Sequence, residues 1–216
     1  MNVLALVTQK GGTGKSSLAV SLAVAAHERG LRTYVIDLDP QGTAKNWYER
    51  RQAEGIEVAS LNASQVETAM GMLTKQGIDL VIIDTPGVDS PATTAAMKVA
   101  TLCLIPARPS VADIEATRPT IQSLNKLGKP FAFVLNQCPP GRSIRTSDAF
   151  RVLLLSGAVA STPLAIRADH QDAMATGQGV TERDTNGKAA AEIRELLQWA
   201  ITRMEGKVNE QETRVA

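Results

Sequence analysis

The stretch Gln9-Lys10-Gly11-Gly12-Thr13-Gly14-Lys15-Ser16-Ser17 (QKGGTGKSS) decides the fold of this chain. An apolar segment, Val3 to Val7, precedes it and is short enough for a buried strand. A run rich in helix-forming residues, 18–26, follows it. Strand, glycine-rich turn and helix in this order are the context in which such a loop binds phosphate. The backbone N–H groups of the loop and the positive end of the new helix then surround an anion.

Two side chains of the loop suit a nucleotide bound with magnesium. Lys15 is placed to reach the terminal phosphates, and Ser16 to offer its hydroxyl to Mg²⁺. The loop departs from the general pattern G-x-x-x-x-G-K-[ST], because Gln9 stands where the first glycine belongs and a second lysine, Lys10, lies inside the loop. The two glycine–lysine groups have no packing role, so we favour phosphate binding over a β-turn that binds nothing.

Length and composition indicate one α/β domain, residues 1–216, with a polar tail from about residue 205. The chain has 216 residues, of which 44% are hydrophobic and 3% aromatic, so aliphatic side chains must fill the core. The formal net charge of +1 provides no overall field for nucleic acid or a membrane. Cys103 and Cys138 form no disulfide framework or four-thiolate metal site. With no basic leader and no membrane-length apolar run, we expect a cytoplasmic protein.

Acidic residues follow two further predicted strands. Asp37 and Asp39 come after the strand 33–36, and Asp84 follows four continuous aliphatic residues, 80–83. Such an aliphatic run is typical of a central parallel strand that is covered on both faces. The carboxyl ends of parallel strands meet at one edge of the sheet, beside the loop. The sequence therefore predicts a doubly wound, mostly parallel sheet with helices on both faces. A mere capping role for Asp37 and Asp39 is the alternative.

The remaining pattern predicts more strands and helices along the chain, and a packing role for Trp47 in the first of these helices. The predicted strands cover 101–105, 131–136 and 159–160; the predicted helices cover 43–54, 64–76, 91–99, 110–127, 146–155 and 188–204.

The loop resembles the deviant Walker A motif, KGGxGK[ST][ST], of the ParA/MinD superfamily of ATPases. The order of the landmarks matches from residue 1 to about 204. Asp39-Pro40-Gln41, Asn46-Trp47 and the run 105–113 (IPARPSVAD) are similar to the small plasmid-partition ATPases of the ParF kind. The resemblance implies a P-loop NTPase fold, with ATP and Mg²⁺ as cofactors.

It also implies roles for individual residues. Lys10 is the signature lysine, expected to cross a dimer interface and touch the ATP of the partner. Lys15 is the P-loop lysine, and Asp39 orients the attacking water. Asn136 is expected at the adenine. The other implied nucleotide-binding residues are Gly11, Gly12, Thr13, Gly14, Ser16 and Ser17, the implied metal site is Ser16, Asp37 and Asp84, and the implied dimer contact is the proline loop near Pro109.

The implied function is a slow ATPase that dimerises on ATP, binds DNA without sequence preference and partitions a plasmid or chromosome. A centromere-binding partner of the ParB or ParG type would stimulate hydrolysis, and the protein would be cytoplasmic and associated with the nucleoid. A solvated charged face is the alternative for the candidate DNA-contacting residues. These are Lys126, Lys129, Arg142, Arg145, Arg151, Arg167, Arg194, Arg203 and Lys207.

Other functions stay open. A MinD-like membrane ATPase would need a terminal basic amphipathic helix, and the stretch 205–212 is too polar and acidic for one, so we expect no membrane partner. A ligase like dethiobiotin synthetase would need a small-molecule pocket, which no motif marks. Positioning of another cargo, such as a microcompartment or secretion machinery, is a third possibility that the sequence does not separate from partition.

Overall fold

The computed structural model describes residues 1–206, which form seven parallel strands in the order β3-β2-β4-β1-β5-β6-β7. Every strand pair is parallel, as a succession of right-handed crossovers produces. The strands are β1 (Asn2–Leu6), β2 (Thr33–Asp37), β3 (Ile56–Ser60), β4 (Leu80–Asp84), β5 (Leu102–Ala107), β6 (Phe131–Leu135) and β7 (Ala158–Val159).

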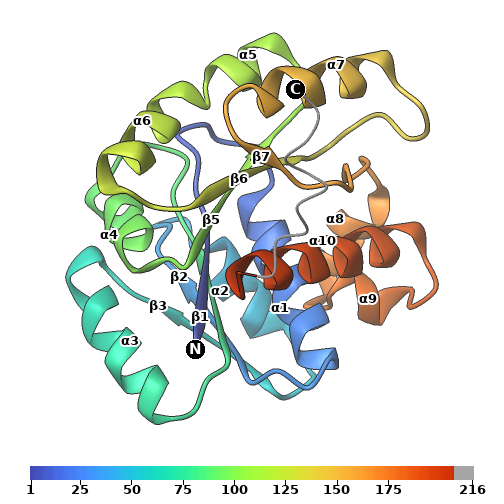
Figure 1. Ribbon diagram of the computed structural model, residues 1–216. Helices are drawn as coiled ribbons and strands as arrows, with labels where there is room; N and C mark the ends of the chain where they lie inside the picture. Colours follow the sequence, from blue (N-terminus) through green and yellow to red (C-terminus); the bar gives the residue numbers. More distant parts are fainter. Residues whose placement is uncertain (207–216) are drawn as a thin grey trace.

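Helices cover both faces of this sheet (Figure 1). One face carries α1 (Lys15–Glu28), α2 (Thr43–Arg50), α8 (Ala168–Thr176), α9 (Val180–Arg183) and α10 (Lys188–Met204). The other carries α3 (Val66–Lys75), α4 (Pro91–Val99), α6 (Arg118–Leu127) and α7 (Ile144–Leu154), with the short η1 (Ala63–Gln65) and α5 (Val111–Glu115) beside them. The predicted doubly wound α/β architecture is therefore confirmed.

The central strands are apolar on both faces, for the reason that the sequence suggested. Along β1, Leu4 and Leu6 join the core under α1, whereas Val3 and Ala5 join the core under α3 and α4. All five residues of β4 are buried. Both strands thus lie between two layers of helices, and their carboxyl ends open at one edge of the sheet.

Helix α1, which follows the loop, is deeply buried. All residues from Leu18 to Ala26 are buried, because the helix lies between the sheet and the pair α9 and α10. Its alanines let the neighbouring backbones come close. Trp47 of α2 is also fully buried, and its indole Nε1 donates to the Gln178 carbonyl at 3.0 Å, which confirms the predicted packing role.

Several element boundaries differ from the predictions. The helix expected over 43–54 ends at Arg50. Residues 51–55 connect it to the edge strand β3, in which only Ile56 and Val58 are buried. The single helix expected over 110–127 is two helices, since the chain turns at 116–117 and Pro119 begins α6 afresh. The short helix α9 was not predicted. The prediction of the polar tail falls, from residue 207, outside the described residues.

Within residues 1–206, no helix combines the length and the apolar character needed to cross a membrane.

Candidate functional site

The glycine-rich loop connects β1 to α1 at the carboxyl edge of the sheet. Gly12 (φ 76°) and Gly14 (φ 87°) have left-handed backbone conformations, which residues with a side chain adopt only with strain. Gly14 is also the N-cap of α1 and offers no side chain to the free N–H groups of the first turn. The loop therefore presents backbone donors and the positive end of a buried helix to its surroundings, which is an arrangement for an anion.

A cleft of about 850 Å³ opens in front of this loop. Its floor is Gly11, Gly12, Gly14, Lys15, Ser16 and Ser17. Its walls are the turn after β2, including Asp39, and the turn after β4, including Gly87. The other predicted site residues do not line the cleft: Lys10, Thr13, Asp37, Asp84 and Asn136 stand behind or beside its walls.

Lys15 connects the loop to the acidic residues. Its side chain is buried, and its Nζ donates to the carbonyl of Lys10 at 3.4 Å. Burial lowers the pKa of Lys15, while the charges of Asp84 and Asp39 raise it. The ammonium thus lies beside the backbone of the loop, and its charge interacts with those of both carboxylates.

Asp84 ends β4 as a buried carboxylate. It is fully buried, and neither of its carboxylate oxygens has a hydrogen-bond partner within residues 1–206. Burial raises the pKa of Asp84 to about 7, and the Ser16 hydroxyl and the Lys15 charge only partly oppose that rise. A buried carboxylate without donors, next to a hydroxyl and a phosphate-type loop, fits a divalent cation.

Asp37 and Asp39 differ in their surroundings. Asp37 lies directly across from Asp84 in the strand register, and its two oxygens accept from the backbone N–H of Asp39 at 3.0 Å and of Lys45 at 2.9 Å. Burial raises the pKa of Asp37, although these hydrogen bonds lower it. Asp37 thus holds the turn into α2. Asp39 accepts from the Gln41 N–H at 3.0 Å and lines the cleft.

Asn136 and Gln137, after β6, brace the loop from the side. The Asn136 Nδ2 donates to the Thr13 carbonyl at 2.7 Å, and its Oδ1 accepts from the Gln137 N–H at 2.9 Å. The Gln137 Nε2 donates to the Gly12 carbonyl at 3.0 Å. A Cβ added to Gly14 would lie only 2.5 Å from the Asn136 Nδ2, so the brace also requires a glycine there.

Lys10 has another partner. Its Nζ lies 3.1 Å from the Asp113 Oδ2 of α5, in the same chain, and its side chain is 27% exposed. The two lysines of the loop therefore diverge, with Lys15 inside the cleft and Lys10 beside it.

This geometry coincides with a match along almost the whole chain, because residues 4–207 match the CobQ/CobB/MinD/ParA nucleotide binding domain. The chain belongs to this family. The predicted ParA/MinD superfamily is thereby confirmed, and the matched domain is a nucleotide-binding one.

Two proteins named maintenance of carboxysome distribution protein A are similar to this ParA/MinD-type chain. The protein from Halothiobacillus neapolitanus is 28% identical over 207 residues, which cover 92% of this chain and 95% of the relative. The protein from Gloeobacter kilaueensis is 31% identical over 195 residues, or 88% of each chain. The chromosome-partitioning ATPase Soj of Thermus thermophilus is 28% identical over a shorter stretch, which is 57% of this chain and 61% of Soj.

Solved structures have the same fold at low sequence identity. MinD from Pyrococcus horikoshii, complexed with Mg-ADP, aligns with a TM-score of 0.78 at 16% identity and covers 97% of this chain and 99% of its own. A plasmid partition protein from Borrelia burgdorferi, bound to AMPPNP, aligns with a TM-score of 0.76 at 17% identity, covering 94% and 99%.

Gly87 was not predicted as a site residue, although it shapes the ParA/MinD-type cleft. A Cβ at Gly87 would lie 2.8 Å from the Gly11 Cα, so the turn after β4 touches the loop directly. Its position, three residues after Asp84 and next to Pro86, is a signal that could have indicated it. Asp113 was quoted only as part of the proline-rich run, and nothing in that run indicates that its carboxylate holds Lys10.

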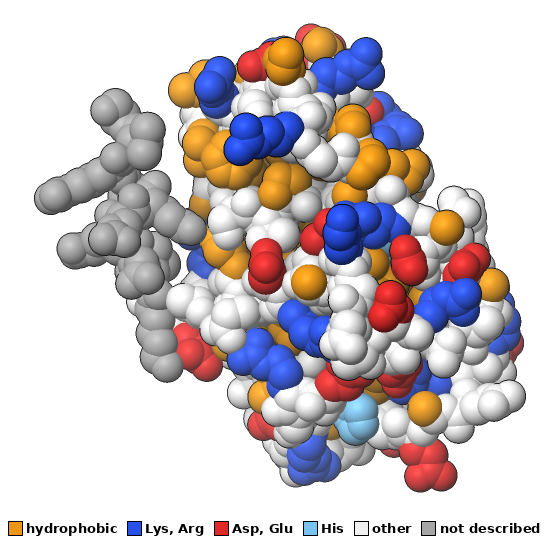
Figure 2. Space-filling view, turned by 90° about the vertical axis from the view of Figure 1, so that its right-hand side faces the viewer, with side chains coloured by type: hydrophobic (Ala, Val, Ile, Leu, Met, Phe, Trp, Pro, Cys, Tyr) orange, Lys and Arg blue, Asp and Glu red, His pale blue; other side chains and the backbone are white. Residues whose placement is uncertain are grey.

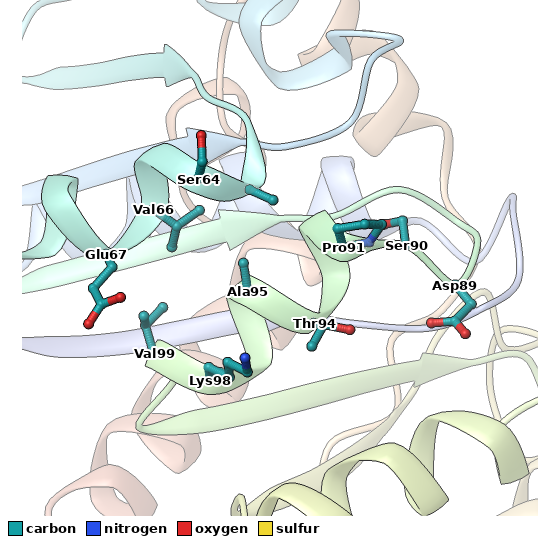
Figure 3. A pocket seen from close by; sticks show the side chains of 11 residues that line it. Ser64, Val66, Glu67, Asp89, Ser90, Pro91, Thr94, Ala95, Lys98 and Val99 are labelled. Atoms are coloured by element: carbon teal, nitrogen blue, oxygen red, sulfur yellow. The ribbon is translucent and has the colours of Figure 1, made fainter.

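A second hollow, of about 820 Å³, lies between η1 and α3 on one side and α4 on the other (Figure 3). In the picture, Val66 and Glu67 face Ala95, Lys98 and Val99 across it. It shares Ala63, Ser90 and Pro91 with the cleft but contains no residue of the loop. The first cleft is therefore the candidate phosphate site.

The candidate DNA-contacting residues are divided by the fold. Arg167 pairs with Glu192, Arg194 lies 3.9 Å from a Glu28 carboxylate oxygen, and Arg203 stacks over Trp199. Arg142 and Arg145, at the start of α7, are exposed and have no ion-pair partner within residues 1–206. Figure 2 shows basic and hydrophobic side chains together in the upper part of this face, where α7 lies.

Proposed function

We propose that this protein is a Mg²⁺-dependent ATPase that dimerises on ATP, binds DNA without sequence preference and positions a cargo. The proposal rests above all on Asp84, a fully buried carboxylate beside a P-loop lysine and a P-loop serine, whose oxygens have no hydrogen-bond partner of normal geometry among residues 1–206. The buried carboxylate suits a cation, and the loop backbone with Lys15 suits an anion. A magnesium–triphosphate pair would satisfy both.

The proposed site divides the work among residues of the cleft. The backbone of 11–17 and the Lys15 ammonium hold the phosphates, while Asn136 braces the loop from the side through the Thr13 carbonyl. Ser16, Asp84 and Asp37 would hold Mg²⁺, which would supply neutralisation of charge on the phosphate oxygens. Asp39 lines the cleft with one oxygen free of backbone contacts, as an acid that orients water requires.

The proposed dimer follows from the position of Lys10. This lysine is close to the cleft but does not line it, so its ammonium is better placed for the nucleotide of a facing subunit. A cation supplied in trans accelerates phosphoryl transfer by roughly 10³–10⁵-fold in related NTPases. Because ATP would contact both subunits, its binding favours the dimer by mass action and hydrolysis releases it.

The DNA surface is proposed at the start of α7. Arg142 and Arg145 are exposed and unpaired among the described residues, and a dimer doubles their number. Nonspecific binding needs only phosphate contacts from such cations. The proposed location in the cell is therefore the nucleoid.

Two cargoes are supported to different degrees. Partition of a plasmid or chromosome, with a ParB- or ParG-type partner that stimulates hydrolysis, fits the likeness to Soj and to the plasmid partition protein. Positioning of a protein microcompartment is the second candidate, because the two carboxysome-distribution relatives match over most of their length.

The test uses the purified full chain with Mg²⁺ and ATP, AMPPNP or ADP. Sedimentation velocity should give a dimer with ATP and AMPPNP and a monomer with ADP. Asp39→Ala should keep the ATP dimer and lose phosphate release. A monomer in every nucleotide, or normal turnover by Asp39→Ala, would contradict the proposal.

The same purified protein can be used to distinguish DNA binding from membrane binding, and one cargo from the other. ATP-dependent binding to random-sequence DNA is expected, whereas binding only to anionic lipid vesicles would favour a MinD-like function. Proteins retained by the Asp39→Ala dimer from cells of the source organism can be identified by mass spectrometry. A DNA-binding protein supports partition, and a compartment-associated protein supports the second candidate.

A further inference from the structure

Lys10 is the side chain on which the proposed dimer depends, yet its ammonium is already engaged within its own chain. We propose that Asp113 is a positioning residue that holds Lys10 on its own subunit until a triphosphate bound in a facing subunit takes the ammonium over. This inference rests on the proposed function, since it concerns the state of Lys10 before the dimer forms.

The holding contact is a compact ion cluster at the start of α5. Asp113 is only 5% exposed, and its Oδ2 lies 3.1 Å from the Lys10 Nζ. The same oxygen accepts from the Ser110 hydroxyl at 2.5 Å, and Oδ1 accepts from the Arg108 Nε at 3.0 Å. Because one partner is almost fully buried, solvent and salt screen this pair less than an ordinary surface ion pair.

The cluster is built so that Lys10 can leave it. Arg108 and Ser110 remain on the carboxylate when Lys10 departs, so Asp113 does not become an unpaired buried charge. Burial alone would raise the pKa of Asp113, but the Ser110, Arg108 and Lys10 donors outweigh it, and the carboxylate is ionised. The contact with Lys10 is thus favourable without being indispensable.

The backbone next to Lys10 permits the side chain to change direction. Gly11 and Gly12 follow it, and a Cβ added at either position would have no heavy atom within 4 Å. The space in the Cβ direction of these two residues is therefore open, although Gly87 and Gln137 contact their backbone from other directions. Lys10 can exchange Asp113 for another acceptor without displacing a buried side chain.

Two acceptors compete for the ammonium of Lys10. The carboxylate of Asp113 favours the separate subunit, and the terminal phosphate of a facing nucleotide favours the dimer. A ligand shifts such an equilibrium only by the difference between its affinities for the two states. Asp113 therefore raises the concentration at which the dimer forms, and it does so most where no terminal phosphate is present to compete.

The test compares Asp113→Asn with the unchanged chain by sedimentation velocity in Mg²⁺ and AMPPNP. Asparagine keeps the shape of the side chain and removes the charge that holds Lys10. Each dimer releases two such contacts, and each charge-assisted hydrogen bond is worth roughly tenfold. The protein concentration at half dimerisation should therefore fall by roughly a hundredfold. Arg108→Met is the matched variant of opposite sign, because Asp113 then keeps Lys10 as its last cation and the dimer should form at higher concentration.

A double-mutant cycle separates positioning from mere folding of α5. In a Lys10→Met background, the Asp113→Asn change should leave the half-dimerisation concentration unaltered, because no ammonium is left to hold. An equal shift in both backgrounds would overturn the inference. So would a half-dimerisation concentration of Asp113→Asn, in the otherwise unchanged chain, that stays the same or rises. If Asp113→Asn fails to fold, as a thermal scan would reveal, the test rests on Arg108→Met alone. A half-dimerisation concentration of Arg108→Met that is unchanged or lower would then overturn the inference.

The outcome for the unchanged chain separates this inference from the proposed function. If the unchanged chain dimerises with AMPPNP and Asp113→Asn shows no shift, only the role of Asp113 fails. If neither chain dimerises, the proposed function fails, and this inference with it. A dimer of Asp113→Asn alone would support the holding contact strongly.

Discussion

The cleft and the α7 surface carry their charges in opposite ways. In the cleft, Lys15 is 6% exposed and Asp84 is 0% exposed, so each charge has lost its water and is aimed at one place. On α7, Arg142 and Arg145 extend into solvent, where the dielectric and salt weaken them. Burying a charge costs desolvation free energy and fixes where its partner must lie. An exposed charge has little desolvation cost and can interact with partners in many positions. The first arrangement suits one defined ligand, and the second suits a repetitive polyanion.

The largest effect is expected at the buried acid. Asp84→Asn keeps the shape of the side chain but removes the charge proposed to hold Mg²⁺. Turnover should fall by roughly 10²–10³-fold, which is the usual loss when one preorganised electrostatic group is removed. Phosphate release under saturating ATP measures it. Turnover near that of the unchanged chain would mean that Asp84 is not part of the metal site.

The same residue should control the pH dependence of stability in the absence of nucleotide and magnesium. Burial raises the pKa of Asp84 from 3.8 to about 7, so the folded chain binds this proton more tightly than the unfolded chain. This contribution to stability is full at low pH and is lost as the pH rises toward 7, by up to about 4 kcal/mol. Urea unfolding in EDTA at about pH 5 and about pH 8 should show the part of this loss that falls between the two, about 3 kcal/mol. Asp84→Asn should flatten it, and an equal loss in the variant would assign the effect elsewhere.

Lys15→Ala removes the other buried charge. Nucleotide affinity should fall by roughly 10–100-fold, because a buried charge-assisted contact to phosphate is lost. Dimerisation in ATP should then disappear at ordinary nucleotide concentrations. Fluorescent-nucleotide titration and light scattering measure the two effects. Ser161→Ala, a surface change far from the loop in sequence, is a control that should leave both unchanged.

Exposed charges should give a smaller effect that depends on salt. Arg142→Glu combined with Arg145→Glu should weaken ATP-dependent DNA binding roughly tenfold or more and reduce the slope of affinity against salt by about two per subunit. Lys75→Glu, an exposed lysine on α3, is the matched control. Should both variants weaken binding equally, net charge rather than the α7 surface would be responsible.

The smallest effect is expected from the brace of the loop. Asn136→Ala removes the donor to the Thr13 carbonyl, so affinity for ATP and GTP should fall together, by roughly threefold to tenfold. Competition titrations with the two nucleotides measure this. A variant that changes the preference between ATP and GTP would place the Asn136 amide on the base itself.

The sequence was sufficient for the fold and for the centre of the cleft, because local chemistry decides both. The continuous aliphatic residues of β1 and β4 require covered strands, and the glycines of the loop require a turn that the next helix completes. Once both strands are parallel, Lys15, Asp39 and Asp84 must converge at one edge of the sheet.

What the sequence did not predict depends on contacts between distant segments. The hold of Asp113 on Lys10 joins residues about a hundred positions apart, and no local pattern encodes it. The edge strand β3 escaped prediction because only one of its faces is covered and its apolar signal is correspondingly short. The break before α6 was likewise hidden, since Pro119 is as compatible with the first turn of a new helix as with a kink.

The contact between Gly87 and Gly11 is one-sided. A methyl group on Gly87 would collide with backbone atoms of the loop, whereas a methyl group on Gly11 would meet nothing within 4 Å. A saturation-mutagenesis screen should therefore find these adjacent positions unequal: position 87 should reject even alanine, and position 11 should accept it without a steric penalty. Steric contact with the protein would then restrict substitution at position 87 and not at position 11.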